Sequence, residues 1–419
     1  MSRLVRVSSA VLCVFVLLIG ASQARADVLS LSMADASERA SRLAPEVQLA
    51  LGHVREADAT HVGAAVIMPV NPRLSVDGRS GLDRDSRGAF GVASTLDMAF
   101  EVGGGPSARV SEADARTRAA ASESSVVRSD ARLAALRAYV AHRLAAMRGE
   151  RAHEAIDLGK RVLTAAIERS SSGAGSEIDV TAAQSELAEF QAQLYAAQAD
   201  ERQSEMELRY LLSIPVRTEL KLTSTLDELA PAAPIETLIE HARSSYPDLQ
   251  AIQARLGMLT ASDERLRAEA FPKLGAFLGV DASPRSPVYG LLGVSMELPF
   301  AQRNQGPRAV VAAERATEAD RYKLTAMRLE MLLRAIRGAY EARRQELAVL
   351  TNEGLPAAQQ HLDMVEIGWR AGHFDIFRLT TAAQSFARLK AARIEVLEQI
   401  WQQRLLLERL TGGKIDEHS

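Results

Sequence analysis

The histidines and carboxylates are the residues of this chain best suited to catalysis or metal binding, and few of them are close in sequence. His361 lies two positions before Asp363, and His373 two positions before Asp375. A zinc site needs three or four such ligands in one place, whereas the eight histidines are scattered. No HExxH, P-loop or GxSxG motif occurs either. We therefore expect no enzyme activity, no bound metal and no cofactor.

The N-terminus has the features of a secretory signal peptide, predicted over residues 1–26. Two arginines precede the apolar run Val11–Gly20, and Ala24-Arg25-Ala26 supplies the small residues of a cleavage site. The run is too short to cross a bilayer as a helix, so an uncleaved anchor is the less favoured alternative. Cys13, the only cysteine, lies inside this run and has no lipoprotein signal before it. A lipid anchor and disulfides are therefore not expected in the mature chain.

Charge and composition narrow the class of protein further. The formal charge of −3 becomes −6 once the three arginines of residues 1–26 are removed, and an acidic chain does not suit nucleic acid. Aromatic residues make up only 5 % of the chain, while Ala, Arg, Glu, Gln and Leu are abundant, which is typical of long helices. No stretch after the signal peptide has the length and hydropathy of a transmembrane helix.

The chain repeats itself after about 200 residues. The pentapeptide TAAQS occurs at Thr181–Ser185 and again at Thr381–Ser385. Three further pairs keep the same order at offsets of 200 to 202, namely Ala44–Gln48 with Tyr246–Gln250, Pro72–Leu74 with Pro272–Leu274, and Gly105-Pro106 with Gly306-Pro307. This regularity indicates a tandem duplication, with one repeat over 27–230 and a second over 231–419.

Each repeat is predicted to hold the same series of elements. A helix of about 30 residues comes first, near 31–65 and 235–270. Two strands come next, since apolar and polar residues alternate around Phe90, Val92, Leu96, Met98 and Phe100, then around Leu274, Ala276, Leu278 and Val280, and around Val288, Leu292, Val294, Met296 and Leu298. Gly78–Gly88 and Ala282–Pro287 have the composition of hairpin loops.

A very long helix is expected after each pair of strands. Ser107–Arg169 contains no proline and would measure roughly 95 Å at 1.5 Å per residue. Arg308–Asn352 is a shorter run of the same kind, and Pro356 is expected to interrupt the helix beyond it. Helices this long need a coiled-coil partner, which the stripe Leu133, Leu136, Val140, Leu144 and Met147 would contact.

Four strands in one chain would form an open sheet with unpaired edges. If the apolar face meets lipid, those edges have no hydrogen-bond partner, and closure by several chains into one barrel solves the problem. Alternation alone fits a soluble sandwich equally well, but the signal peptide and the long helices favour the shared barrel.

This pattern resembles the TolC-like outer-membrane factors of tripartite efflux and type I secretion systems, over essentially the whole mature chain. The motifs are short, and their repeated order carries the resemblance. They are Pro45-Glu46-Val47 and Pro247-Asp248-Leu249, the Pro-x-Leu strand starts, Leu298-Pro299-Phe300 with Gly306, and the helix-to-helix turns Arg169–Gln184 and Gly368–Gln384.

The resemblance implies an α+β membrane protein whose long coiled-coil helices form a periplasmic α-barrel. Four strands per chain would contribute to a twelve-stranded outer-membrane β-barrel in a homotrimer. It implies a passive exit duct that works with a periplasmic adaptor and an inner-membrane pump of the RND or ABC type, embedded in outer-membrane lipid. The cargo stays open among metal ion, drug and secreted protein. The alternatives are a periplasmic coiled-coil adaptor without a pore and a secreted enzyme on a helical scaffold.

The glycine-bearing turns are the predicted adaptor-docking tips, because glycine accepts the positive φ of a reversing chain and the resemblance places the adaptor there. The alternative is that these glycines only end helices. The candidate docking residues are Arg169, Ser170, Gly173, Gly175, Gly368, Arg370 and Gly372.

The predicted periplasmic gate is where the two halves differ. Proteins of this family often carry an aspartate five residues before the Ala-Gln step, as Asp179 does here. Counted in the same way, the second half has Leu379, beside Arg378, with Asp375 the nearest carboxylate. A three-fold ring of carboxylates in a narrow pore would favour cations. Asp179, Asp375 and Arg378 are the candidate gate residues, and the alternative is that Asp179 is an ordinary helix N-cap.

Overall fold

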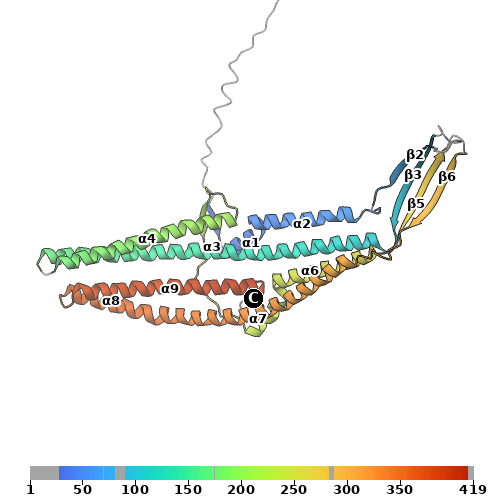
Figure 1. Cartoon of the computed structure of the whole chain (residues 1–419). Helices are drawn as coiled ribbons and strands as arrows, with labels where there is room; N and C mark the ends of the chain where they lie inside the picture. The colour runs from blue at the N-terminus through green and yellow to red at the C-terminus, as the bar shows by residue number, and fades with distance from the viewer. Residues whose placement is uncertain (1–27, 69, 81–89, 174, 283–286, 414–419) are drawn as a thin grey trace, which may run out of the picture.

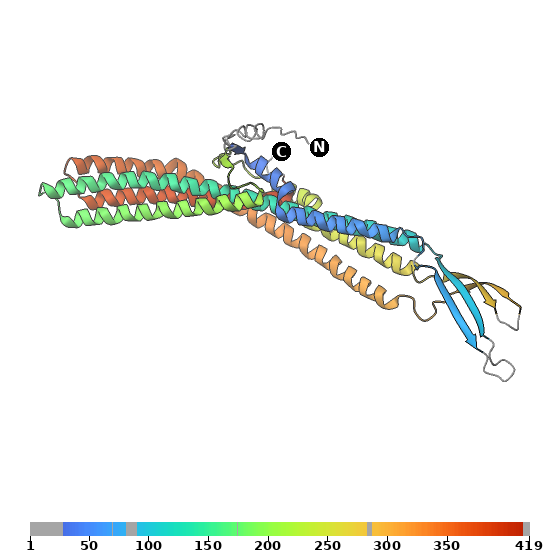
Figure 2. The ribbon, with the colours of Figure 1, turned by 90° about the horizontal axis from the view of Figure 1, so that it is seen from above.

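The computed structural model describes residues 28–68, 70–80, 90–173, 175–282 and 287–413. These residues form an elongated molecule with a helix bundle at one end and a small sheet at the other (Figures 1 and 2). The predicted signal peptide and Cys13 lie outside the described residues, as do residues 81–88 and 283–286 of the predicted hairpin loops.

Five helices build the long part of the molecule, and the prediction of very long helices is confirmed. Helix α3 has 67 residues, which corresponds to about 100 Å. The bounds are α3 (Gly105–Ser171), α4 (Glu177–Leu211), α7 (Gln305–Val349), α8 (Leu355–Arg370) and α9 (Ile376–Thr411). Among the described residues, no helix combines the length and the hydropathy needed to cross a membrane.

Pro356 does not interrupt the chain as predicted. Helix α7 continues into α8 through a π-helical turn, Leu350–Gly354, which ends two residues before the proline. Proline has no N–H to donate and its ring crowds the carbonyl four residues earlier, here Asn352 inside the wide turn. The π turn accommodates both effects, so the helical backbone continues into α8.

The shorter helices come in two pairs rather than as the single helices predicted. They are α1 (Met33–Leu43) with α2 (Pro45–Ala64), and α5 (Ile235–Ser245) with α6 (Pro247–Ala268). Each break falls on the residue before a proline, where Ala44 has ψ 138° and Tyr246 has ψ 115°. The proline ring excludes the helical conformation from the residue before it.

The four predicted strands form one antiparallel sheet in the order β2-β3-β5-β6. Strand β3 pairs with β5, so this sheet joins the two halves of the chain. The strands are β2 (Arg73–Ser80), β3 (Phe90–Glu101), β5 (Lys273–Ala282) and β6 (Tyr289–Met296). The predicted loops began too early, because residues 78–80 and Ala282 belong to strands. Leu74, Leu96, Leu278 and Leu292 share one face of the sheet by register.

Two further strands, β1 (Val28–Leu31) and β4 (Glu219–Leu222), pair in parallel near the middle of the molecule and were not predicted. The hydroxyl of Tyr139 fixes this sheet to α3, because it donates to the carbonyl of Leu31 at 3.0 Å and accepts from the amide of Ser224 at 2.9 Å. Strands of four residues show too little alternation to be recognised in a sequence.

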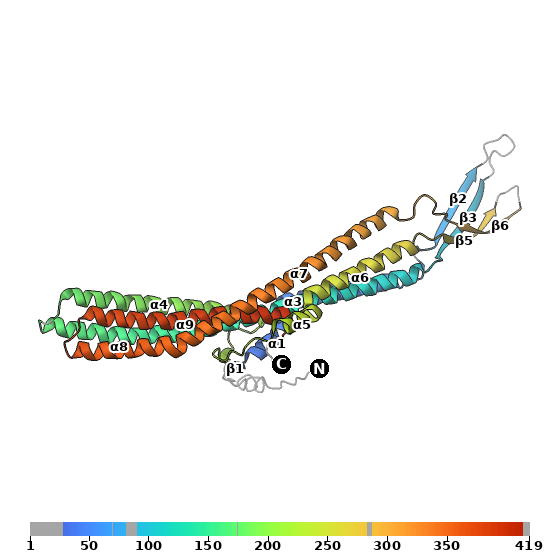
Figure 3. The ribbon, with the colours of Figure 1, turned by 90° about the horizontal axis from the view of Figure 1, so that it is seen from below.

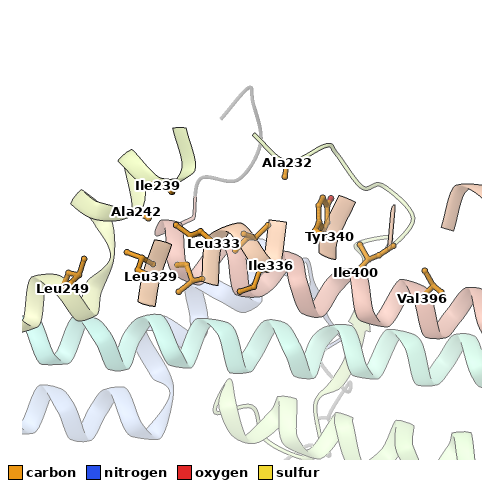
Figure 4. Close-up of a cluster of buried hydrophobic side chains, with 12 residues drawn as sticks. Ala232, Ile239, Ala242, Leu249, Leu329, Leu333, Ile336, Tyr340, Val396 and Ile400 are labelled. Carbon is orange, nitrogen blue, oxygen red and sulfur yellow. The ribbon is translucent and has the colours of Figure 1, made fainter. Parts of the chain in front are cut away.

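The buried residues form a series of clusters along the molecule rather than one core. Figure 4 shows the largest of them, in which Leu333 and Tyr340 of α7 pack near Ile400 of α9 and Ile239 of α5. The predicted coiled-coil stripe is used as expected, since Leu136, Val140 and Leu144 pack against Leu397, Trp401 and Leu405 of α9. Side by side, the helices nearest the sheet take the order α2-α3-α6-α7.

Candidate docking tips and gate

The two helix-to-helix turns, α3–α4 and α8–α9, lie at the same end of the molecule, away from the sheet (Figure 3). One hydrophobic cluster joins all four helices there. It contains Val162 and Ala166 of α3, Ala183 of α4, Trp369 of α8, and Leu379 and Ala383 of α9, among others. The predicted docking and gate residues are therefore brought together on one packed tip.

The first turn reverses the chain through two glycines that act differently. Gly173 has φ +74°, in the region where glycine has no Cβ penalty. Gly175 permits close approach of the chain, because a Cβ there would lie 3.1 Å from the Ser170 amide nitrogen. Its own amide donates to the Arg169 carbonyl at 3.0 Å.

Asp179 belongs to the cap of α4 but is not the N-cap. The N-cap is Ser176, whose hydroxyl accepts from the Asp179 amide at 3.3 Å. The Asp179 carboxylate in turn accepts from the Ser176 amide at 3.0 Å. This reciprocal arrangement is a capping box, and it leaves the Asp179 side chain half-buried and already bonded.

The second turn uses the carboxylate at the N-cap itself. Gly372 has φ +79°, and Asp375 accepts from the Arg378 amide at 2.9 Å. The Arg378 guanidinium lies 5.1 Å from the centre of the Phe374 ring. That ring packs against Gly368, where an added Cβ would meet it at 2.5 Å.

A groove of about 830 Å³ lies between α3 and α8 at this tip. Val162, Trp369 and Leu379 form its apolar floor, and its rim carries Lys160, Arg161, Glu168, Arg169, Glu366 and Arg370. Trp369 is only 9 % exposed, and its indole nitrogen finds no hydrogen-bond partner among the described residues. The Arg169 guanidinium lies over the same indole at 5.9 Å. The groove thus offers an apolar floor and a mostly basic rim.

Three predicted docking residues, Arg169, Arg370 and Gly372, line this groove. Ser170, Gly173, Gly175 and Gly368 shape the turns beside it. The predicted gate residues Asp375 and Arg378 lie outside it, in a separate hollow of about 570 Å³ with His361 and Phe377. Sequence reasoning missed Trp369, although one of only two tryptophans in the chain next to the predicted Gly368 and Arg370 was a usable signal.

Metal binding by the tip receives no support from the geometry. His361 and His373 do not gather with enough carboxylates, and no group of three metal-ligating side chains occurs in the part of the chain that the structure describes.

Comparison with known proteins gives the family. Residues 238–413 match the family model of outer membrane efflux proteins. This second half of the chain belongs to the outer membrane efflux protein family. The predicted function as an efflux channel and the predicted location in the outer membrane, with a periplasmic helical part, are confirmed, and the homologues are channels rather than enzymes.

Individual relatives are similar to this chain, in sequence or in structure, over almost its full length. The cobalt-zinc-cadmium resistance protein CzcC of Cupriavidus metallidurans is 26 % identical over 364 residues, which is 85 % of each chain. The solved outer-membrane channel OprN has a TM-score of 0.76 at 18 % identity and covers 91 % of this chain and 90 % of its own. CusC has a TM-score of 0.73 at 14 % identity, covering 91 % and 92 %.

Proposed function

We propose that three copies of this chain close into one tube, which serves as the outer-membrane exit duct of a tripartite efflux system. The proposal rests on the unpaired edges of the sheet and of the helix layer. The sheet ends at β2 on one side and β6 on the other, and the helix layer ends at α2 and α7. Both layers therefore stay open on the same two sides. A head-to-tail contact between β6–α7 of one copy and β2–α2 of the next would close them together.

The side chains at these edges support the closure. Helix α7 exposes an apolar stripe at Val310, Leu324, Met327 and Met331, while α2 exposes Leu49 and Val62. Exposed apolar stripes of this kind mark contacts between proteins. Three sheets of four strands would make a twelve-stranded barrel without edges, as membrane strands require. The recurrence of helix pair, strand pair and long hairpin in both halves supports the duplication into 27–230 and 231–419.

The groove at the helical tip is the proposed docking site for a periplasmic adaptor, which would connect the duct to an inner-membrane pump. Its rim holds more basic than acidic side chains, so we expect an adaptor helix that presents an apolar residue to Trp369 and a carboxylate to Arg161 or Arg169. The name of the relative CzcC supports divalent cobalt, zinc or cadmium as cargo. A deletion strain should then become sensitive to these ions and not to dyes.

Assembly is tested by the double substitution Leu324→Glu and Met327→Glu on the α7 stripe. We expect the detergent-resistant trimer of the outer-membrane fraction to disappear, because the acidic groups would be buried without partners. The matched control is Arg315→Glu, nine positions earlier, which lies about half a turn away on the helix surface. A trimer that survives the double substitution would contradict the proposed contact, and a wild-type chain found as a soluble periplasmic monomer would contradict the duct itself.

A further inference from the structure

A polar pocket of about 270 Å³ lies where helices of the two halves of the chain meet. Its lining comes from α1 and α3 of the first half and from α5, α6 and the end of α9 in the second half. Three arginines, one glutamate and four serines belong to this lining. The contact proposed between copies uses none of these helices, because it runs through α2 and α7. The pocket therefore stays accessible and offers mainly cationic and hydroxyl groups to a ligand.

The α3 wall of the pocket carries two arginines without a carboxylate partner. Ser125, Arg128, Ser129 and Arg132 follow one another at spacings that place them on one face of the helix. The Arg128 guanidinium lies 3.5 Å from the Ser124 hydroxyl, and within the described ranges neither Arg128 nor Arg132 forms an ion pair. Guanidinium groups pair with carboxylates through two parallel N–H donors, so this wall suits a carboxylate ligand.

Arg409 of α9, the third arginine of the lining, is already paired. Its guanidinium lies 2.7 Å from an Asp130 carboxylate oxygen and 2.9 Å from an Asp248 carboxylate oxygen. These two ion pairs join the end of α9 to α3 and to α6. They hold the end of α9 beside the pocket, and they leave Arg128 and Arg132 as the arginines that can bind a ligand.

The chain leaves α9 at the pocket itself. Gly412 and Gly413 both line the pocket and have φ values of +67° and +105°, in the region that favours glycine. The Gly413 amide donates to the Glu408 carbonyl at 2.8 Å, which ends the helix in a tight turn. Whatever follows Gly413 in the sequence therefore starts at the pocket.

The segment that follows, residues 414–419, has the sequence KIDEHS and lies outside the described residues. Asp416 is three positions beyond Gly413, which corresponds to at most about 10 Å of extended chain. The carboxylates of Asp416 and Glu417 are thus within reach of the α3 wall. Tethering gives such a segment an effective concentration of millimolar order at the pocket, which favours it over a free anion.

We propose that the pocket binds the carboxylates of Asp416 and Glu417, with Arg128 and Arg132 as their partners. We name this contact the acidic clip. It would tie the chain beyond α9 to the middle of α3, across the border between the two halves. Together with the ion pairs of Arg409, it makes the end of α9 a fixed point of the molecule. The competing occupants are a free anion and the same segment of another copy.

Disulfide trapping tests the acidic clip in the full chain. Cys13 is the only natural cysteine and belongs to the predicted signal peptide. The variant combines Ser129→Cys with Asp416→Cys, and outer-membrane fractions are oxidised with copper phenanthroline. We expect both thiols to become unreactive to maleimide without a cross-linked dimer, because a disulfide needs Cα atoms within about 7 Å.

The matched control combines Ser111→Cys with Asp416→Cys. Ser111 is 18 residues before Ser129, so it lies on the same face of α3 but about 27 Å away. Equal trapping at the two serines would mean that the segment has no preferred site, and a disulfide-linked dimer would assign it to another copy. Either result would overturn the acidic clip. Ser125→Cys, on the same wall, replaces Ser129→Cys if that variant fails to fold.

The role of charge is tested by adding Arg128→Gln and Arg132→Gln to the trapping variant. The rate of disulfide formation should fall about two- to five-fold, the effect expected of exposed ion pairs, and 1 M salt should have a similar effect. An unchanged rate would contradict the arginines as partners of the segment.

A free anion is distinguished by thermal unfolding with inorganic phosphate. Phosphate should raise the unfolding temperature of the Asp416→Asn, Glu417→Gln double variant more than that of the wild-type chain, because the acidic clip already fills the pocket in the wild type. Equal stabilisation of the two proteins would identify a free anion as the occupant and overturn the acidic clip.

Discussion

The two turns at the helical tip are built from the same parts in a different arrangement. In each, a glycine with positive φ lies three residues before the N-cap of the next helix, Gly173 before Ser176 and Gly372 before Asp375. TAAQS, however, begins five residues after the first N-cap and six after the second. One extra residue turns a helix by about 100°. Relative to its cap, the second repeat is therefore rotated by that amount.

This rotation changes which residue corresponds to Asp179. Counted from TAAQS, its counterpart is Leu379; counted from the N-cap, it is Arg378. The structure supports the count from the N-cap, because Asp179 and Arg378 both occupy the third helical position. The carboxylate that caps the first helix comes from this third position, Asp179, whereas the one that caps the second helix is the N-cap itself, Asp375. Leu379 is therefore free to join the hydrophobic cluster, where it is 2 % exposed.

The strongest test of this comparison exchanges the residue types at Asp179 and Leu379, the two positions that align through TAAQS. Leu379→Asp should destabilise the tip by about 3 kcal/mol or more, because it buries a carboxylate without a partner. Asp179→Leu loses only one side of a capping box and should cost about 1 kcal/mol or less. Thermal unfolding of the detergent-solubilised protein measures both. Equal losses would mean that the two positions are equivalent after all.

The sequence was sufficient to predict the architecture, but it was insufficient to predict how the second repeat is rotated relative to its helix cap. The alternation around Leu278 and the proline-free run of α3 are long periodic signals, so the strands and long helices were predicted correctly. The rotation at Asp375 depends on one residue and on cap geometry, which no periodicity records. Trp369 was missed for a related reason, since the groove around it is made by α3 and α8, which are about 200 residues apart in sequence.

Gly368 distinguishes the second turn from the first through packing. Gly368→Ala would place its Cβ 2.5 Å from the Phe374 ring, and overpacking of this kind costs about 1–3 kcal/mol. Adding Phe374→Ala should restore much of the loss, since the clash is with that ring. Gly149→Ala in α3 is the control, because nothing lies within 4 Å of the added Cβ. Thermal unfolding of these three variants and of the wild-type chain is the measurement, and the absence of rescue by Phe374→Ala would contradict the contact.

Removing each N-cap should weaken the two turns alike. Ser176→Ala and Asp375→Ala should each cost about 1 kcal/mol, because an amide at the helix start loses its acceptor. The effect should be local, so hydrogen exchange of the first-turn amides of α4 and α9 is the suitable measurement. Arg378→Ala is the control, since only its backbone amide takes part in the cap. Faster exchange in only one of the two helices would show that the turns are not built alike.

The gate proposal makes the smallest and most selective prediction, because asparagine caps a helix about as well as aspartate. Asp375→Asn should therefore keep the fold and remove one charge per chain. If Asp375 lines a cation-favouring constriction, this substitution lowers the cation preference that a reversal potential in planar bilayers reports. Asp179→Asn should change it less, because that carboxylate is half-buried and already bonded to Ser176. The rotation of the second repeat leaves Asp375 exposed at the start of its helix, so a larger effect of Asp179→Asn would mean that the constriction is built by the first turn.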